Sequence, residues 1–316
     1  MIKPKKLKPG DTIGVVMPAS PSWAPSEITR AKEYLENMGY KVVIGKNVNK
    51  TKGFTSASEQ ERADDINEMF ARDDIDAVFS AQGGYGSAQL IDKIDYDMIR
   101  KHPKIFTGFS DITSLHLAIR KFSGLMTFYA PGMSRFNEED LSDYTKESFF
   151  RTLGKAEPAG EIKKVDPKNW LTTISGGVCE APVVGGCMTL VCASLGTAYE
   201  IDCKDKILFF EDLDTEPWTF DHMLSHLRNA GKLDDAAGFM IGHCNNCEPF
   251  KFEPGYLCDT SLEDVLLYYL EPLGKPALYG LPMGHGDHLA TLPLGARCRL
   301  DADKKSFTVL ESGVTE

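Results

Sequence analysis

Ser110 has the position in this chain that most directly suggests chemistry. It stands in KIFTGFSDITSLHLAI (104–119), where an apolar run ends and an amphipathic run begins with no turn residues between them. A tight strand-to-helix turn after Gly108 exposes a serine hydroxyl as a nucleophile and aims the N–H of Asp111 at the developing oxyanion. Serine is also a favoured helix N-cap, and Ile112 departs from the full G-x-S-x-G elbow. The local sequence leaves both interpretations open.

A pair of glycines favours the catalytic interpretation. Gly83 and Gly84 lie in QGGYG after an apolar run, and glycines let backbone amides approach a substrate closely. They can therefore supply the second oxyanion donor. The alternative is a phosphate cradle, but the segment lacks both the lysine of a P-loop and the GxGxxG spacing.

A serine nucleophile needs a base and a group that orients the base. Glu211 ends the apolar run ILFFE, where it suits either a solvated strand end or a catalytic acid. His285 lies in GLPMGHGDH, flanked by glycines that suit an exposed imidazole. Serine, glutamate and histidine in this chain order, each at the end of a strand, predict a catalytic triad.

The sequence offers only weak signals for a metal. Cys244 and Cys247 have half the spacing of a zinc site, but no second pair follows. His222 and His226 share a helix face without the glutamate of HExxH. We therefore expect no metal and no organic cofactor.

The elements that must position these residues alternate through the first half of the chain. Strands are expected at 11–19, 40–46, 75–81 and 104–109, and helices at 26–39, 59–73, 87–94 and from 111 to about 121. This alternation predicts a doubly wound α/β domain with a parallel sheet. The loops PASPSW, QGGYG and FSD follow three of its strands and should lie on one rim.

The second half predicts a mixed α/β domain of undetermined topology. A short buried helix is expected in MTLVCASLG, strands at 206–212 and 236–243, and helices at 218–233 and 261–274. The pattern weakens between the halves, so we expect domains at 1–155 and 176–316 with a linker at 156–175.

Charge and hydropathy exclude several partners. Lys plus Arg is 35 and Asp plus Glu is 46, a net charge of −11 that repels nucleic acid and anionic membranes. No apolar run approaches the about 20 residues that span a bilayer. The basic N-terminus has only a brief apolar segment broken by Pro9 and Gly10, unlike a signal peptide. We expect a cytoplasmic protein.

Five spaced motifs resemble the LD-carboxypeptidase family, the serine peptidases S66, which includes muramoyltetrapeptide carboxypeptidases and microcin C immunity peptidases. The motifs are LKPGDTIGVVMPASP, AQGGYGSAQL, FTGFSDITSLH, LFFED and LYGLPMGHGDHLATLPLG, in order over nearly the whole chain. The resemblance implies two lobes with the active site between them. It assigns the nucleophile to Ser110, the acid to Glu211 and the base to His285.

The resemblance further implies a small peptide substrate and, because members often dimerise, a homodimer. The expected reaction releases the terminal D-alanine of a muropeptide by hydrolysing an L-to-D peptide bond, with Asp111, Gly83 and Gly84 at the oxyanion. Tyr85, Trp170 and Gly186 are the expected substrate contacts.

Two departures from the family pattern concern specificity. Gln82 stands where many members have arginine before the paired glycines, and Cys187 and Met188 follow Gly186 where the family often has G-G-N-L. Two alternatives therefore remain. One is an immunity-type peptidase that cleaves an aminoacyl-nucleotide amide and uses Trp170. The other is a muropeptide-binding protein without activity.

Overall fold

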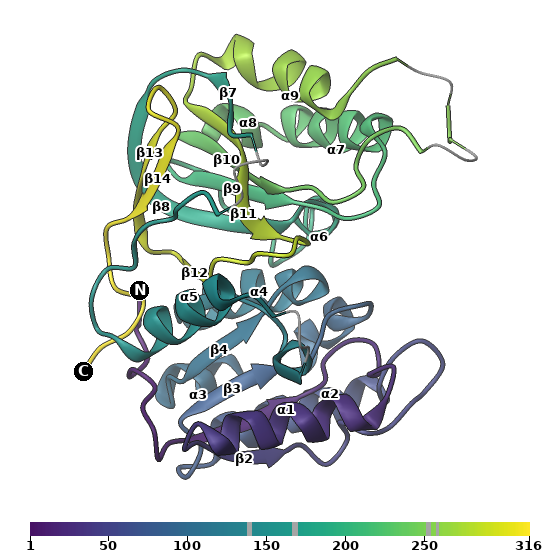
Figure 1. Ribbon diagram of the computed structural model, residues 1–316. Helices are drawn as coiled ribbons and strands as arrows, with labels where there is room; N and C mark the ends of the chain where they lie inside the picture. Colours follow the sequence, from purple (N-terminus) through teal and green to yellow (C-terminus); the bar gives the residue numbers. More distant parts are fainter. Residues whose placement is uncertain (138–140, 166–169, 251–253, 257–258) are drawn as a thin grey trace. The chain divides into compact units, whose positions relative to one another are not determined.

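The computed structural model describes residues 1–137, 141–165, 170–250, 254–256 and 259–316. It divides into two compact units (Figure 1). The first unit comprises Met1–Pro158, Ala290–Gly295 and Ser312–Glu316, and the second comprises Ala159–Leu289 and Ala296–Glu311. The first unit thus includes two C-terminal segments that the expected boundaries assign to the second domain. Residues 166–169 of the expected linker lie outside the described residues.

The first unit has a doubly wound sheet, as the sequence predicts. Its strands, in spatial order, are β12 (Leu292–Leu294), β5 (Thr127–Tyr129), β4 (Ile105–Gly108), β3 (Ala77–Ser80), β1 (Thr12–Val16) and β2 (Lys41–Ile44). All neighbours pair in parallel except β12, which is antiparallel to β5. The central strands are buried on both faces and are nearly all apolar, the pattern of a covered parallel sheet.

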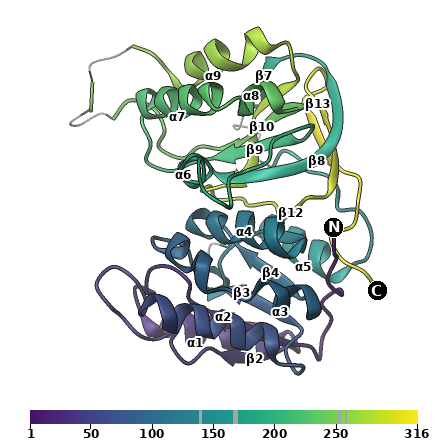
Figure 2. The ribbon, with the colours of Figure 1, turned by 180° about the vertical axis from the view of Figure 1, so that it is seen from behind.

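Helices cover both faces of this sheet. They are α1 (Pro25–Asn37), α2 (Glu59–Ala71), α3 (Tyr96–Lys101), α4 (Thr113–Ser123) and α5 (Asp143–Gly154). Successive residues of β3 point to opposite faces. Phe79 packs in a core with residues of α1 and α5, and Val78 packs with residues of α2, α3 and α4. Figure 1 shows α1 in front of the sheet, and Figure 2 shows α2 on the opposite face.

Several helical segments of the first unit differ in detail from the sequence prediction. The segment expected as a helix at 87–94 is the 3-10 helix η1 (Ser87–Lys93), and α3 was not predicted. The helix expected from Asp111 begins with the 3-10 turn η2 (Ser110–Ile112) before α4. A further 3-10 helix, η3, spans Met133–Asn137. The start of α2 follows its sequence, since Ser58 and Glu61 form a capping box.

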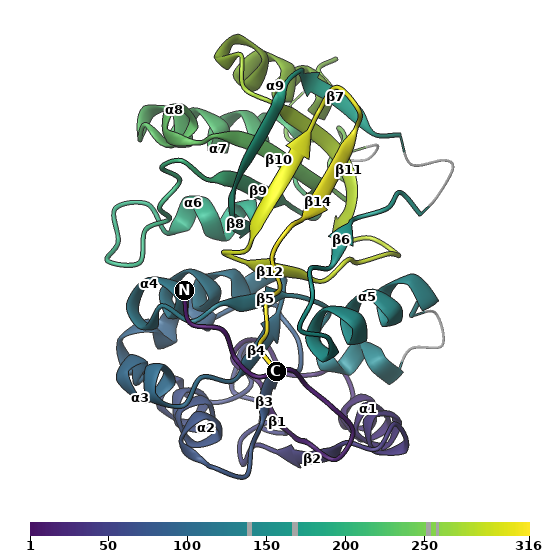
Figure 3. The same ribbon diagram turned by 90° about the vertical axis from the view of Figure 1, so that its left-hand side faces the viewer.

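The second unit contains a mixed sheet. Its strands, in spatial order, are β6 (Gly160–Glu161), β14 (Ser306–Val309), β13 (Arg297–Asp301), β8 (Val178–Cys187), β9 (Ile207–Glu211), β10 (Gly238–His243), β11 (Ala277–Gly284) and β7 (Thr172–Ser175). The strands β8 to β11 run parallel, and the outer pairings are antiparallel. Figure 3 shows β13 and β14 in yellow beside β8.

The helices of the second unit lie in the segments that the sequence predicts to be helical. They are α6 (Met188–Ala193), α7 (Pro217–Asn229), α8 (Lys232–Asp235), α9 (Leu262–Leu270) and the 3-10 helix η4 (Glu271–Leu273). The run predicted as one helix at 218–233 is broken at Gly231, whose positive φ ends α7 and starts α8. In the part of the chain that the structure describes, no helix has the length and apolar character needed to span a membrane.

Candidate active site

Ser110 occupies the elbow that follows β4 and is the first residue of η2. Its φ is +60°, a left-handed conformation that is strained in a non-glycine residue. The residues that cap η2 and α4 are Phe109 and Ile112, neither through a side-chain hydrogen bond. The N-cap interpretation of Ser110 is therefore wrong. A Cβ at position 108 would lie 2.6 Å from the Ile112 side chain, so Gly108 makes room for the tight turn.

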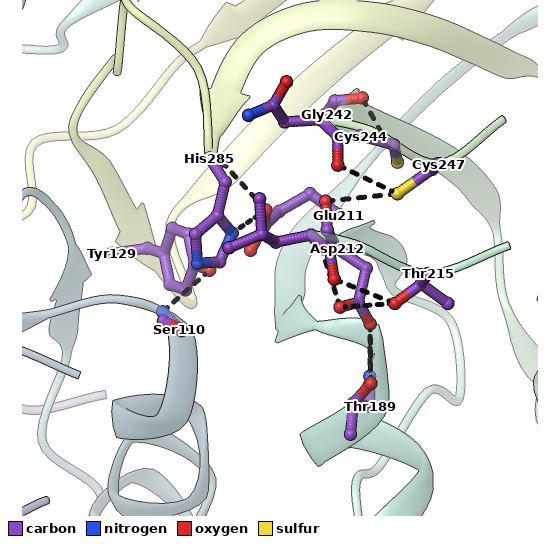
Figure 4. Close-up of polar contacts among 12 residues, drawn as sticks. Ser110, Tyr129, Thr189, Glu211, Asp212, Thr215, Gly242, Cys244, Cys247 and His285 are labelled. Atoms are coloured by element: carbon purple, nitrogen blue, oxygen red, sulfur yellow. Dashed lines mark hydrogen bonds and ion pairs between the residues drawn. The ribbon is translucent and has the colours of Figure 1, made fainter. Parts of the chain in front are cut away.

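Two buried side chains hold the elbow in place. The backbone N–H of Ser110 donates to the Tyr129 hydroxyl at 3.1 Å (Figure 4). His116 is fully buried on α4, and its Nε2 lies 2.9 Å from the carbonyl oxygen of Gly108. Burial lowers the pKa of His116 to about 4. The imidazole is therefore neutral at pH 7, with its proton on Nε2, where it donates to that carbonyl.

The glycine pair packs directly against the serine. A Cβ on Gly83 would lie 2.9 Å from Cβ of Ser110 and 3.3 Å from its Oγ. Gly84 has φ +110°, and a side chain there would strike Ser20. The backbone N–H of Ser20 donates to the carbonyl oxygen of Gly83 at 3.3 Å. These contacts confirm that the loops after β1, β3 and β4 share one rim.

Arg62 and Asp111 clamp the segment after the glycines. Arg62 is 2% exposed, and its guanidinium donates to the carbonyl oxygens of Pro18 and, at 2.9 Å, of Gly86. The Asp111 carboxylate accepts the backbone N–H of Ser87 at 2.8 Å, and the Asp111 carbonyl accepts the Ser87 hydroxyl at 2.5 Å. Burial raises the pKa of Asp111, against the hydrogen bonds from Ser87 and the charge of Arg62. The clamp fixes the glycine loop relative to the elbow.

Gln82, which the sequence singles out as a departure from the family pattern, makes two hydrogen bonds to the backbone of a neighbouring loop. Its Nε2 donates to the carbonyl oxygen of Pro21 at 2.5 Å and to that of Ser20 at 3.4 Å. The amide thus joins the loop after β3 to the loop after β1. The structure therefore gives Gln82 a loop-holding role.

Glu211 and His285 form a hydrogen-bonded pair in the second unit (Figure 4). Glu211 ends β9 with no exposed surface, and its Oε2 lies 2.7 Å from Nδ1 of His285. The same oxygen accepts the backbone N–H of His285 at 3.0 Å. With Nδ1 as the donor to this oxygen, Nε2 is left as the basic nitrogen. Gly284, with φ +108°, permits this approach because a side chain there would strike Glu211.

Asp212 anchors the end of β9 beside this pair. It is 4% exposed, and its Oδ2 accepts both the N–H and the hydroxyl of Thr189 at 2.8 Å. Thr189 is the second residue of α6, which follows Gly186 and Cys187. These two residues of β8 pair with Phe210 and Glu211 across the sheet. The end of β8, where Cys187 stands, is therefore held next to the catalytic glutamate candidate.

The remaining substrate contacts expected from the sequence are exposed. Tyr85, 55% exposed, belongs to the first unit and follows the glycine pair. Trp170, 80% exposed, belongs to the second unit and precedes the edge strand β7. The Nζ of Lys164 lies 5.5 Å from the centre of the Trp170 ring. The structure thus shows the Glu211–His285 contact and the Ser110–Gly83 contact, each within its own unit.

The cysteine pair makes hydrogen bonds to backbone carbonyls. Sγ of Cys247 donates to the carbonyl oxygen of Asp212 at 3.6 Å, and Sγ of Cys244 to that of Gly242 at 3.9 Å (Figure 4). Burial raises the pKa of the Cys244 thiol, which opposes the thiolate form that binds metal. Across the described residues, no three His, Cys, Asp or Glu side chains are grouped to hold a metal ion.

Sequence reasoning missed the supporting residues. Arg62 shares a helix face with the apolar residues Ile66 and Met69. A charged residue on the buried face of a helix was therefore the signal that could have identified it. Asp212 directly follows Glu211 at the end of a buried strand. Two neighbouring acids at that position were the available signal, and only Glu211 was given a role from the sequence. Tyr129 carries no comparable signal, because its hydroxyl meets Ser110 only through the pairing of β4 with β5.

Two family models match the chain. The LD-carboxypeptidase N-terminal domain matches residues 13–130, and the LD-carboxypeptidase C-terminal domain matches residues 180–300. The triad candidates Ser110, Glu211 and His285 fall within these spans.

Relatives and solved structures agree with these matches. A Bacillus subtilis (strain 168) protein named a probable murein peptide carboxypeptidase is 40% identical over 99% of this chain and 96% of its own length. The microcin C7 self-immunity protein MccF of Escherichia coli is 30% identical over 96% and 94%. The structure of MccF in complex with glutamyl sulfamoyl guanosine matches with a TM-score of 0.90 and 28% identity, covering 100% of both chains. Muramoyltetrapeptide carboxypeptidase from Oxalobacter formigenes matches with a TM-score of 0.81 and 26% identity over 94% and 97%.

Proposed function

The chain belongs to the LD-carboxypeptidase family, and from this membership we propose that it is a serine carboxypeptidase of muropeptides. The reaction is hydrolysis of the L-to-D peptide bond of a tetrapeptide, with release of the terminal D-alanine. The observation that carries the proposal is the buried Glu211 carboxylate at 2.7 Å from Nδ1 of His285. A carboxylate in this position orients a histidine and stabilises it as it gains a proton.

In this proposal Oγ of Ser110 attacks the carbonyl carbon of the third substrate residue. Its proton passes to Nε2 of His285, and the resulting oxyanion accepts from the N–H groups of Asp111 and of Gly83 or Gly84. The intermediate collapses, the C–N bond breaks, and His285 returns the proton to the amine of D-alanine. Water then hydrolyses the acyl-enzyme by the same route. The mechanism requires Oγ of Ser110 and Nε2 of His285 to meet.

The elbow geometry supports the nucleophile assignment. The positive φ of Ser110 is strain that persists only where the surroundings hold it, and Tyr129, His116 and the Arg62 clamp provide that support. Strain of this kind is common at functional sites. The contact between Gly83 and Ser110 brings the glycine amides close to the reacting hydroxyl.

A second candidate function uses the same catalytic groups on another substrate. The similarity to MccF, whose solved complex contains glutamyl sulfamoyl guanosine, and the exposed indole of Trp170 favour cleavage of an aminoacyl-nucleotide amide. The 40% identity to the murein peptide relative favours the muropeptide. A comparison of kcat/KM on the two substrates decides between them.

The main test measures D-alanine release from a disaccharide-tetrapeptide. We expect Ser110→Ala to abolish release and a serine-reactive phosphonate to label the wild type but not His285→Ala. His222→Ala, which changes an exposed histidine on α7, is the matched control and should keep both activities. Undiminished release by Ser110→Ala would refute the proposal. Tight muropeptide binding without labelling or turnover would instead identify a binding protein.

The proposal also includes a cytoplasmic homodimer that needs no metal. Light scattering after size exclusion measures the mass of the assembly, and cell fractionation measures its location. Dialysis against a chelator should leave kcat unchanged, because no step of the proposed mechanism uses a metal ion.

A further inference from the structure

Three loops of the first unit are joined into one framework beside Ser110. The Ser20 hydroxyl donates to the carbonyl oxygen of Phe54 at 2.9 Å and accepts the backbone N–H of Tyr85 at 3.0 Å. Ser56 ties the Phe54 loop to the loop that follows β1. Its backbone N–H donates to the carbonyl oxygen of Ala19 at 2.9 Å, and its hydroxyl donates to that of Met17 at 2.6 Å. The backbones that carry Phe54 and Tyr85 are therefore fixed relative to each other.

The framework presents two aromatic rings to solvent. Phe54 is 67% exposed and Tyr85 is 55% exposed, and their ring centres lie 5.0 Å apart at an interplanar angle of 79°. Phe54 lies at the tip of a tight turn in which Lys52 and Thr55 exchange backbone hydrogen bonds. Exposed aromatic rings held by a rigid backbone lose little conformational entropy when a ligand covers them. This preorganisation is typical of a binding surface.

We propose that the Phe54–Tyr85 ring pair is a subsite for a pyranose ring of the substrate, the sugar to which the stem peptide is attached. The inference rests on the proposed function and specifies how that function recognises the part of the muropeptide farthest from the cleaved bond.

The position of the pair fits this occupant. Tyr85 follows two residues after Gly83, which packs on Ser110, so their backbones are separated by at most about 7 Å. Three residues of a tetrapeptide separate its cleaved bond from the sugar and span at most about 10 Å. A substrate whose carbonyl lies at Ser110 can therefore reach the rings with its sugar.

The shape of the surface favours a sugar over a nucleotide. Rings at 79° form a corner in which the C–H face of a puckered pyranose rests on one ring while its substituents meet the other. A flat base stacks on only one of the two rings.

The test compares two substrates that differ only in the sugar. We expect wild-type kcat/KM for the disaccharide-tetrapeptide to exceed that for the free tetrapeptide by about tenfold, the effect of one good ring contact. Phe54→Ala and Tyr85→Ala should each bring this ratio close to one. Tyr85→Phe keeps the ring and should keep most of the preference.

Tyr268→Ala is the control, because Tyr268 is a 64% exposed aromatic residue on α9 of the second unit and should leave the ratio at the wild-type value. A ratio near one in the wild type, or a ratio that survives both alanine changes, would overturn the subsite.

Calorimetry separates failure of the subsite from failure of the proposed function. The Ser110→Ala protein is titrated with the disaccharide-tetrapeptide, with and without Phe54→Ala. If the wild type hydrolyses neither substrate, the proposed function fails, yet a roughly tenfold loss of affinity on Phe54→Ala still supports the subsite. Equal affinities of the two proteins for the disaccharide-tetrapeptide would overturn the subsite. Loss of affinity only for an aminoacyl sulfamoyl nucleoside would assign the rings to a base and overturn the sugar assignment.

Discussion

Gly83→Ala perturbs the nucleophile through a single methyl group. Gly83 is not one of the described glycines with positive φ, so alanine can adopt its backbone conformation. The new Cβ would lie 2.9 Å from Cβ of Ser110 and 3.2 Å from the carbonyl oxygen of Phe109. Carbon atoms prefer a separation of roughly 3.5 to 4.0 Å. The substitution therefore has to push the serine and the glycine loop apart.

The required movement sets the size of the effect. The shortfall at Ser110 is about 0.6 Å or more, and a displacement of about 1 Å at a reacting group costs about 100-fold in rate. We expect kcat to fall roughly 30- to 100-fold, a rise of about 2 to 3 kcal/mol in the activation barrier. The free energy of unfolding should fall by about 1 to 3 kcal/mol, the usual cost of overpacking, so the variant should remain folded.

A coupled assay with D-amino-acid oxidase measures kcat and KM for D-alanine release, and urea denaturation measures stability. Gly154→Ala is the matched control, because its new Cβ would also lie close to a backbone oxygen, 3.2 Å from that of Leu7, but at the end of α5. A Gly83→Ala enzyme with kcat within threefold of the wild type would refute the assignment of Gly83 to the reacting centre.

Two further predictions concern the residues around the nucleophile and its base. Glu211→Gln should lower kcat by about 10³- to 10⁴-fold, because an amide no longer fixes the protonated Nδ1 of His285. Steady-state kinetics with Glu180→Gln as an exposed control test this, and retention of a tenth of kcat would contradict it. The pKa of His116 is about 4 in the fold and about 6.5 when unfolded, so the unfolded state binds more protons between these values. The free energy of unfolding should therefore fall by about 2 kcal/mol from pH 7 to pH 5. The His116→Gln variant lacks this group and should show a smaller fall. Equal pH dependence in urea melts of both proteins would count against it.

The alternation of strands and helices made four strands of the first sheet predictable, β1 to β4, whereas β5 was not predicted. The apolar runs form strands buried on both faces, and the amphipathic runs form helices. The type of each element can therefore be predicted from its own residues. The strand β12 was not predictable, because its three residues pair with β5 more than 160 positions earlier. A tertiary pairing of that separation leaves no local signal. The break of α7 at Gly231 was readable in principle, since glycine commonly ends helices.

The candidate site was predictable in its reacting groups and not in their supports. Ser110, Glu211 and His285 stand at abrupt changes of pattern that the sequence shows directly. The close contacts that position these three side chains are made by residues distant in the sequence. Arg62 reaches the glycine loop from α2, and Gly284 makes room for a glutamate 73 residues earlier. Close approaches of this kind follow from packing, which pattern reasoning does not resolve.

The chain path through the first unit has a consequence for synthesis. The edge strand β12 and the segment Ser312–Glu316, which pairs with the N-terminus through Lys5 and Thr315, both belong to the first unit. The ribosome synthesises residues Ala159 to Leu289 before it reaches β12, the strand that completes this edge of the sheet. A nascent chain therefore carries β5 as an open sheet edge while the second unit is being made, the kind of edge that invites wrong pairing. Truncation after residue 289 should leave the same edge unprotected, so the first unit cannot be isolated by cutting the chain at one place.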